Sequence, residues 1–254
     1  MAGHSHSANI KYRKERVNAA KAKVFSKLAR MITVAARIGG GDPDTNPRLR
    51  LAIEKARVAS MPKDNIERAI KKGTGDGDVG NFEEVLYEGY APAGIAVMLE
   101  ILTDNRNRTA AEIRKLFERH GGNLGTTGAV AWMFDRKATF PVARSSEFDE
   151  DRLLEIALEA GAEDLTTTEG GFEIRCDAGS FAAVREALVA AGVPFSGEEV
   201  GYVPSTVVEI DRVEDARRVV RCLDALEEHD DVQSVYANAS FSDEVLARLA
   251  EEDA

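Results

Sequence analysis

Apolar residues recur at helical spacing through the first 72 positions of the chain. From Val17 to Ile38 they step by seven, four and three positions, which places them on one face of a helix. Asn46 followed by Pro47 matches the cap and the first position of a second helix, over residues 47–58. A third helix is expected from Pro62 to Gly73. Residues 1–72 therefore predict a helical domain.

A glycine-rich stretch over residues 73–80 separates these helices from a pattern in which strands alternate with helices. Strands are expected at Glu84–Tyr90, Ile95–Thr103, Ala129–Phe134, near Thr139, at Thr166–Thr168, at Phe172–Cys176, near Tyr202, at Thr206–Ile210 and at Val232–Tyr236. Helices are expected at about Arg106–His120 and at Asp151–Ala160, Phe181–Ala191 and Val213–Glu228. The order over residues 136–204 is strand, helix, strand, strand, helix, strand, which is that of a ferredoxin-like domain.

These elements predict an α+β fold class, with an N-terminal helical domain followed by two α/β domains, the last of ferredoxin-like order inserted in the other. The segment after residue 205 is too short to form a sheet of its own, so we expect it to complete the sheet begun at 84–134. The predicted domains are a basic helical domain with its linker over 1–80, an α/β domain over 81–135 plus 205–254, and the inserted domain over 136–204.

Composition favours a folded, water-soluble protein. The chain has 254 residues, of which 44% are hydrophobic and 30% charged, and its longest nearly apolar run is far shorter than the roughly 20 residues of a membrane span. The beginning of the chain has no apolar segment typical of a secretory signal. Cys176 and Cys222 have no metal or redox spacing. We therefore expect a cytoplasmic protein that does not contact membranes.

Charge is distributed unevenly along the chain. The net charge is −11, yet residues 1–80 carry 17 Lys and Arg against 8 Asp and Glu, and residues 81–254 carry 16 against 36. A local excess of cations attracts polyanions, whereas an acidic excess keeps a surface solvated. The first third of the chain is therefore expected to bind a polyanion.

The cations of the first predicted helix fall on the face opposite its apolar stripe. At about 100° per residue, Arg16, Lys23, Lys27, Arg30 and Arg37 share one arc. Because solvated helix faces usually mix both signs of charge, this pattern favours phosphate binding over an ordinary solvated face. Lys11, Arg13 and Lys14 extend the face into an arm that could become ordered on a nucleic acid.

A second candidate contact lies at the start of the helix expected from Arg106. Arg106 and Arg108 fall in its first turn, where the helix dipole disfavours cations and the free amides favour an anion. The alternative is a capped loop whose arginines pair with Asp104 or Glu112. Both interpretations fit the sequence equally well.

Signatures of catalysis and metal binding are missing from the sequence. Four histidines form no zinc motif, and neither a nucleophile elbow nor a Walker A sequence occurs. Gly75 to Gly80 matches a dinucleotide-binding pattern in letters only, because a helix precedes it and a strand follows it. We therefore expect no catalytic residues, metal ligands, cofactor or small-molecule substrate, and hence no enzyme.

Several motifs resemble the YebC family along nearly the whole chain. They are Ala2-Gly-His-Ser5, Ala8-Asn-Ile-Lys11, Ile32-Thr-Val-Ala-Ala-Arg37, Gly39-Gly-Gly-Asp-Pro43, Asn46-Pro-Arg-Leu-Arg-Leu-Ala52, Met61-Pro-Lys-Asp-Asn-Ile-Glu-Arg-Ala69, Leu102-Thr-Asp-Asn-Arg-Asn-Arg-Thr109 and Gly121-Gly-Asn-Leu-Gly125. The resemblance implies three domains without catalytic activity. Bacterial members are generally described as DNA-binding transcriptional regulators, mitochondrial relatives are translational activators, and some bacterial members act as ribosome-associated translation factors.

Three functions remain open at this point. The first is a non-enzymatic, nucleic-acid-binding regulator of gene expression whose partner is DNA. The second is a ribosome-associated, RNA-binding translation factor whose partner is ribosomal RNA. The third is an adaptor whose acidic domains recruit a basic protein. Phosphate-binding cations do not distinguish DNA from RNA, because both polymers present phosphates.

Overall fold

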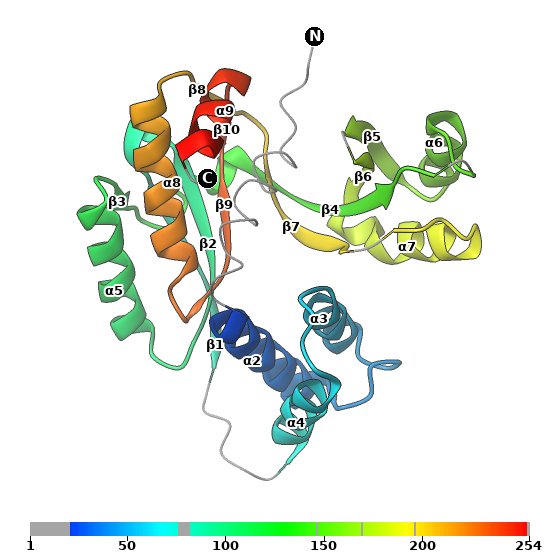
Figure 1. The fold of residues 1–254 in the computed structure, drawn as a ribbon. Coiled ribbons are helices and arrows are strands. Elements are labelled where there is room, and N and C mark those ends of the chain that lie inside the picture. The colour runs from blue at the N-terminus through cyan, green and yellow to red at the C-terminus, as the bar shows by residue number, and fades with distance from the viewer. Residues whose placement is uncertain (1–20, 76–81, 146, 169, 196, 253–254) are drawn as a thin grey trace. The chain divides into compact units, whose positions relative to one another are not determined.

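The computed structural model describes residues 21–75, 82–145, 147–168, 170–195 and 197–252. Contacts divide the chain into two compact units, which run over residues 1–133 together with 206–254 and over residues 134–205. Each unit has its own layered arrangement of helices and strands (Figure 1).

Three helices form the N-terminal part of the first unit. They are α2 (Lys21–Gly39), α3 (Pro47–Val58) and α4 (Lys63–Thr74). The cap of α3 is the predicted one, since the side chain of Asn46 accepts a hydrogen bond from the amide of Leu49 at 3.1 Å. The apolar faces of the three helices meet in one core, which includes the fully buried Ile32 and Leu49.

Gly73 does not end its helix, contrary to the sequence-based expectation. Helix α4 continues to Thr74, and a Cβ on Gly73 would lie 2.3 Å from the carbonyl oxygen of Thr33 on α2. Glycine is therefore required here because two helix backbones approach each other closely, a tertiary contact that a local pattern does not report.

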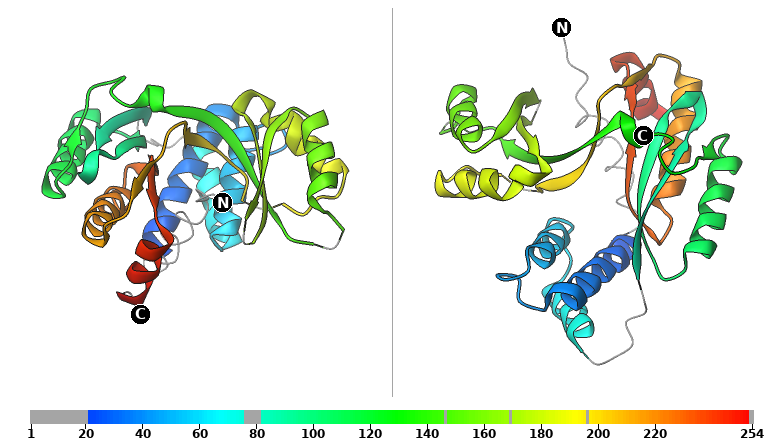
Figure 2. Two further views of the ribbon diagram at one scale, coloured as in Figure 1. Left: turned by 90° about the horizontal axis from the view of Figure 1, so that it is seen from above. Right: turned by 180° about the vertical axis from the view of Figure 1, so that it is seen from behind.

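The first unit also contains a four-stranded sheet in the order β3-β1-β2-β9. These strands are Asn123–Leu124, Glu83–Tyr90, Ala96–Thr103 and Val232–Ala237. Helices α5 (Arg106–Arg119) and α8 (Val213–Glu227) lie on the same face of the sheet (Figures 1 and 2). Their buried side chains, among them Ile113 and Val219, share one core with β2 and β9.

Beyond residue 205 the topology differs in part from the prediction. Strand β9 joins the sheet beside β2 as expected. Strand β8 (Val208–Ile210) instead pairs in parallel with β10 (Ala239–Phe241) in a separate two-stranded sheet. Helix α9 (Asp243–Glu252) follows β10, and neither of these last two elements was predicted.

The predicted strand Ala129–Phe134 is wrong, because Ala129 and Val130 lie in a loop and the next three residues form the short 3₁₀ helix η3 (Ala131–Met133). Only Phe134 belongs to a strand, the one that begins the second unit. The buried carboxylate of Glu88 on β1 accepts hydrogen bonds from the amides of Gly128, Val130 and Ala131 at 2.7, 2.8 and 2.8 Å. Amides bound in this way are not available to a neighbouring strand. The alternation of apolar residues therefore reflects the anchoring of a loop.

The second unit has ferredoxin-like topology, as predicted. Its elements are β4 (Phe134–Ala143), α6 (Glu150–Glu159), β5 (Ala162–Thr168), β6 (Gly171–Asp177), α7 (Phe181–Ala190) and β7 (Glu199–Pro204). The strand order is β5-β6-β4-β7, with every neighbouring pair antiparallel. Phe140 and Ile174 are fully buried, in one core with the inner residues of both helices.

The predicted α+β fold class is confirmed, with N-terminal helices followed by units that contain sheets. The boundaries of the three predicted domains remain a prediction. Within the described ranges, no helix combines the length and the apolar character needed to cross a membrane.

Candidate nucleic-acid interface

The predicted phosphate-contacting cations of α2 fall into two groups. Lys23 and Arg37 are exposed, and the guanidinium of Arg37 donates a hydrogen bond to the carbonyl of Gly75 at 2.9 Å. Lys27 and Arg30 instead contact the segment between α8 and β9. Arg16 of the predicted helix face and Lys11, Arg13 and Lys14 of the predicted arm lie outside the described residues.

Lys27 contacts the backbone at the end of α8. Its amino group donates a hydrogen bond to the carbonyl of Glu227. Burial lowers the pKa of Lys27 from 10.5 to about 8, although the nearby charges of Glu227 and Asp230 favour the protonated form. The sequence predicted a phosphate-contacting cation here, and the structure shows a half-buried one with an internal partner.

Arg30 forms an ion pair with the buried carboxylate of Asp231. Its NH1 atom lies 2.8 Å from Oδ1 of Asp231 and also donates to the carbonyl of Asp230 at 3.1 Å. The other carboxylate oxygen accepts hydrogen bonds from Arg108 at 2.8 Å and from Thr109 at 2.7 Å. Burial alone would raise the pKa of Asp231, but these hydrogen bonds outweigh burial, so its pKa lies below the ordinary value.

Arg106 and Arg108 both have carboxylate partners. Arg106 lies 3.8 Å from Glu83, and Arg108 pairs with Asp104 at 3.0 Å in addition to Asp231. The side chain of Asn105 caps α5 by accepting a hydrogen bond from the amide of Arg108. These contacts agree with the alternative in which the two arginines pair with nearby carboxylates beside a capped helix start. An anion contact at this helix start stays a prediction.

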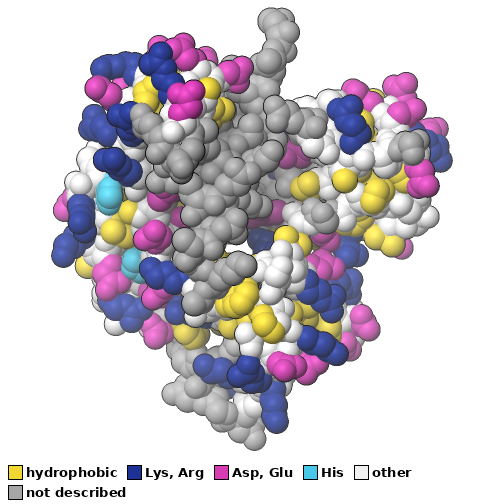
Figure 3. Space-filling view, in the orientation of Figure 1, with side chains coloured by type: hydrophobic (Ala, Val, Ile, Leu, Met, Phe, Trp, Pro, Cys, Tyr) yellow, Lys and Arg dark blue, Asp and Glu magenta, His cyan; other side chains and the backbone are white. Residues whose placement is uncertain are grey.

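A basic groove runs between α2 and α4. The hollow measures about 540 Å³, and none of its eleven described lining residues is Asp or Glu. Its cations are Arg30, Arg68 and Lys72, and the aromatic rings of Phe25 and Phe82 lie among them. The Arg30 guanidinium carbon is 5.4 Å from the centroid of the Phe82 ring, within the range of a cation–π contact. Figure 3 shows Lys and Arg side chains beside apolar ones over the N-terminal helices.

Arg68 and Lys72 are not among the contacts that the sequence predicts. The two lie four residues apart and so share one side of α4, which was the available signal. What the spacing did not show is that this side faces α2, because the packing of the two helices depends on the close approach at Gly73.

A second cleft, of about 700 Å³, adjoins Arg30 and has mixed charge. Its cations are Lys23, Arg30, Arg108, Lys115 and Arg119, and its acidic residues are Asp104, Glu112, Glu228, Asp230 and Asp231. Since the two signs balance, this cleft would not concentrate a polyanion as the groove would.

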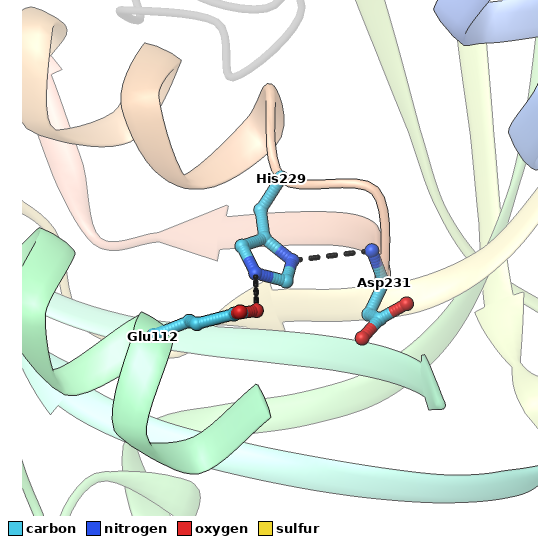
Figure 4. A group of neighbouring side chains, drawn as sticks. All are labelled: Glu112, His229 and Asp231. Carbon is cyan, nitrogen blue, oxygen red and sulfur yellow. Dashed lines mark hydrogen bonds and ion pairs between the residues drawn. The ribbon is translucent and has the colours of Figure 1, made fainter. Parts of the chain in front are cut away.

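Glu112, His229 and Asp231 converge in this cleft, as Figure 4 shows. The Nδ1 atom of His229 accepts a hydrogen bond from the backbone amide of Asp231 at 3.1 Å, which places the ring proton on Nε2. Nε2 lies 2.9 Å from the Glu112 carboxylate. Both ring nitrogens therefore have partners, and the carboxylate of Asp231 is bound by two arginines. This donor set does not suit a cation.

Comparisons with known proteins cover both parts of the chain. Residues 5–76 match the family model for the N-terminal domain of TACO1/YebC proteins. Residues 82–239 match the model for the second and third domains of the same family.

Curated bacterial relatives match over nearly their full length. A protein of Halothermothrix orenii is 51% identical over 99% of this chain and 100% of the relative. One of Pelotomaculum thermopropionicum is 53% identical over 96% of this chain and 100% of the relative. Both are named probable transcriptional regulatory protein. The crystal structure of a conserved hypothetical protein from Aquifex aeolicus has a TM-score of 0.78 and 48% identity, covering 89% of this chain and 93% of that one.

Proposed function

Because the chain belongs to the TACO1/YebC family, we propose that it is a regulator of gene expression that binds nucleic acid and catalyses no reaction. The name of its relatives, probable transcriptional regulatory protein, supports DNA as the first candidate target. Both cysteines are free and buried, which fits a reducing compartment such as the cytoplasm.

The basic groove between α2 and α4 is the observation that carries this proposal. Arg30, Arg68 and Lys72 line it without a carboxylate among its described lining residues. Because Arg30 is paired with Asp231, Arg68 and Lys72 supply most of the attraction for a phosphate backbone. Phe25 and Phe82 add apolar surface for sugars or bases. Arg37 extends the positive surface along the solvent-exposed part of α2, where Lys23 is also exposed although it lines the mixed-charge cleft.

Neutralising the groove in the full-length protein tests this proposal. Each phosphate contact that is lost should reduce the slope of log affinity against log salt by about 0.7 to 0.9. Arg68→Gln combined with Lys72→Gln should therefore weaken binding to labelled duplex DNA or single-stranded RNA and reduce the slope by about 1.4 to 1.8.

The matched control carries Lys63→Gln and Lys71→Gln. Both lysines are exposed on the same helix and do not line the groove, so the control has the same change in net charge. If the two double variants lose affinity equally, only the net charge of the domain matters and the groove is not the binding site. If the parent protein binds neither polymer, the proposed function is wrong.

Recruitment of a basic protein is a second candidate function, and the charge of the second unit favours it. Residues 134–205 carry six Lys and Arg against fifteen Asp and Glu. Four of these cations are paired within the unit: Lys137 with Glu163, Arg152 with Glu155, Arg175 with Glu173 and Arg185 with Glu198. Crosslinking in growing cells, with DNase, RNase and protease treatments run in parallel, distinguishes DNA, RNA and protein as the bound partner.

A further inference from the structure

The side chain of Trp132, the single tryptophan of the chain, is exposed to solvent. Its exposed fraction is 73%, whereas Val130 on one side is fully buried and Phe134 on the other is 7% exposed. A large aromatic side chain normally contributes to folding by being buried. Here the residues on either side of Trp132 are buried while its indole ring is exposed to solvent. Exposed aromatic side chains of this kind are typical of binding surfaces.

The backbone next to Trp132 is held by hydrogen bonds to side chains of β1. The Glu88 carboxylate, on a residue only 5% exposed, accepts hydrogen bonds from the amides of Gly128, Val130 and Ala131. Burial raises the pKa of Glu88, but these three amides outweigh burial and leave the pKa below its ordinary value, so the carboxylate stays ionised and bound. The hydroxyl of Tyr90 also donates to the carbonyl of Ala129 at 3.1 Å. A backbone anchored in this way loses little conformational entropy when a ligand binds to the exposed side chain.

The segment around Trp132 is also free of acidic residues. From Arg119 to Phe134 the sequence contains no Asp or Glu, in a chain that has 44 of them. Arg119 and His120 open the segment, and four glycines and two threonines follow before Trp132. A phosphate-bearing ligand would therefore meet no carboxylate within this stretch of sequence.

We propose that Trp132 is a stacking platform for an unpaired nucleobase of a single-stranded nucleic acid. This inference rests on the proposed nucleic-acid binding and assigns it a second contact, distinct from the groove between α2 and α4. Every base has a π-face that can stack on an indole ring. A duplex keeps these faces stacked inside the helix, so the ligand must be single-stranded. RNA and DNA share the base chemistry and differ in the 2′-hydroxyl.

The test uses the tryptophan fluorescence of the full-length protein, excited at wavelengths that tyrosine does not absorb. The emission then reports on this one residue because no other tryptophan is present. Binding is measured independently, by the anisotropy of labelled unstructured oligonucleotides of uridine RNA and thymidine DNA. We expect both to quench the indole emission with the same midpoint as the anisotropy change. A duplex is expected to bind without this quenching. Acrylamide quenching of the free protein checks that the ring is accessible to solvent.

Variants give a second measurement. Stacking contributes enough per base that Trp132→Ala should weaken single-strand binding by roughly 5- to 150-fold, and Trp132→Phe should weaken it less. Val207→Ala is the control, because Val207 is also apolar and 57% exposed in the same unit, and we expect unchanged affinity.

The outcomes separate the two proposals. Binding by anisotropy without quenching, or equal quenching by duplex and single strand, would overturn the stacking role and leave nucleic-acid binding intact. Unchanged affinity of a folded Trp132→Ala protein would do the same. Failure of every nucleic acid to bind the parent protein would overturn both. The quenching measurement decides the question even if Trp132→Ala does not fold.

Discussion

Arg30 and Asp231 lie 201 positions apart in the sequence and form an ion pair of 2.8 Å that joins α2 to the start of β9. The same guanidinium lines the basic groove and the mixed-charge cleft. Asp231 therefore fixes the position of one groove cation while Arg108 and Thr109 satisfy its second oxygen. One buried carboxylate thus connects the proposed binding surface to the core of the first unit.

Replacing Asp231 with Asn should destabilise the protein. The substitution keeps the shape of the side chain but removes the carboxylate that pairs with Arg30 and one of those that pair with Arg108, which retains Asp104. A hydrogen bond to a charged group contributes about 1.5 to 3 kcal/mol. Urea unfolding of the full-length protein measures the loss. The neighbouring Asp230→Asn is the control, because Asp230 is exposed and such surface changes usually stay within about 0.5 kcal/mol. Equal destabilisation by the two variants would argue against a special role for Asp231.

The stability contributed by Asp231 should depend on pH. Its pKa is depressed in the folded state, so the contribution is fully present above the unfolded-state pKa of about 3.9. It is lost as the pH falls through the lower folded-state value. We therefore expect the stability difference between the parent and Asp231→Asn to be constant from neutral pH to about pH 5 and to shrink at lower pH. Urea titrations at a series of pH values measure it, and a difference that disappears well above pH 5 would contradict the expected sign.

Two cations of α2 are expected to affect nucleic-acid affinity, and the other two are expected to affect stability. From the sequence alone, all four cations lie opposite the apolar stripe, so reversing them to Glu is predicted to leave folding intact; they are Lys23, Lys27, Arg30 and Arg37. The structure changes this prediction for two of the four. Lys23 and Arg37 are exposed, so their reversal should reduce nucleic-acid affinity at unchanged stability. Lys27 and Arg30 contact Glu227, Asp230 and Asp231, so their reversal places acids against acids and should lower the urea midpoint. A Lys27 and Arg30 double reversal as stable as the parent would contradict these internal contacts.

Local patterns predicted most of the elements, because their causes are local. The helix at Pro47–Val58 follows from a cap and a proline that lie next to each other in the sequence. The ferredoxin-like order of the second unit follows from regular alternation of strands and helices. In both cases neighbouring residues decide the structure.

The features that the sequence did not predict depend on distant partners. The segment expected to be a strand at Ala129–Phe134 is largely a loop and a 3₁₀ turn, because Glu88, about forty residues earlier, binds the amides of Gly128, Val130 and Ala131. Lys27 and Arg30 have internal partners about 200 residues later. Arg68 and Lys72 became candidates only through the packing of α4 on α2. Helical spacing gives the face on which a charge lies but not what that face contacts.

The two thiols should react slowly in the folded protein. Burial raises the pKa of both Cys176 and Cys222 to about 11, with nearby acidic residues adding to the shift at Cys176. Because the thiolate is the reactive form, a disulfide reagent at neutral pH should modify neither cysteine until the protein unfolds. Absorbance of the released thiolate, followed with and without urea, measures this. Rapid modification of one equivalent in the native protein would contradict the burial of that thiol.

Removal of residues 134–205 should leave the first unit folded. Phe134 and Pro204 are paired on the adjacent strands β4 and β7, so the chain enters and leaves the second unit at neighbouring positions, about 5 Å apart as in any such pair. A short glycine-serine linker between Met133 and Thr206 can span this distance. The core of the remaining unit draws on α5, α8, β2 and β9, all of which are retained. We therefore expect cooperative urea unfolding both of the shortened protein and of the isolated fragment 134–205.

The control deletes only 162–177, which removes β5 and β6 from the second sheet and should abolish folding of that unit although fewer residues are lost. Non-cooperative unfolding of the shortened protein would show that the first unit depends on the inserted segment and that the predicted domain boundary is wrong.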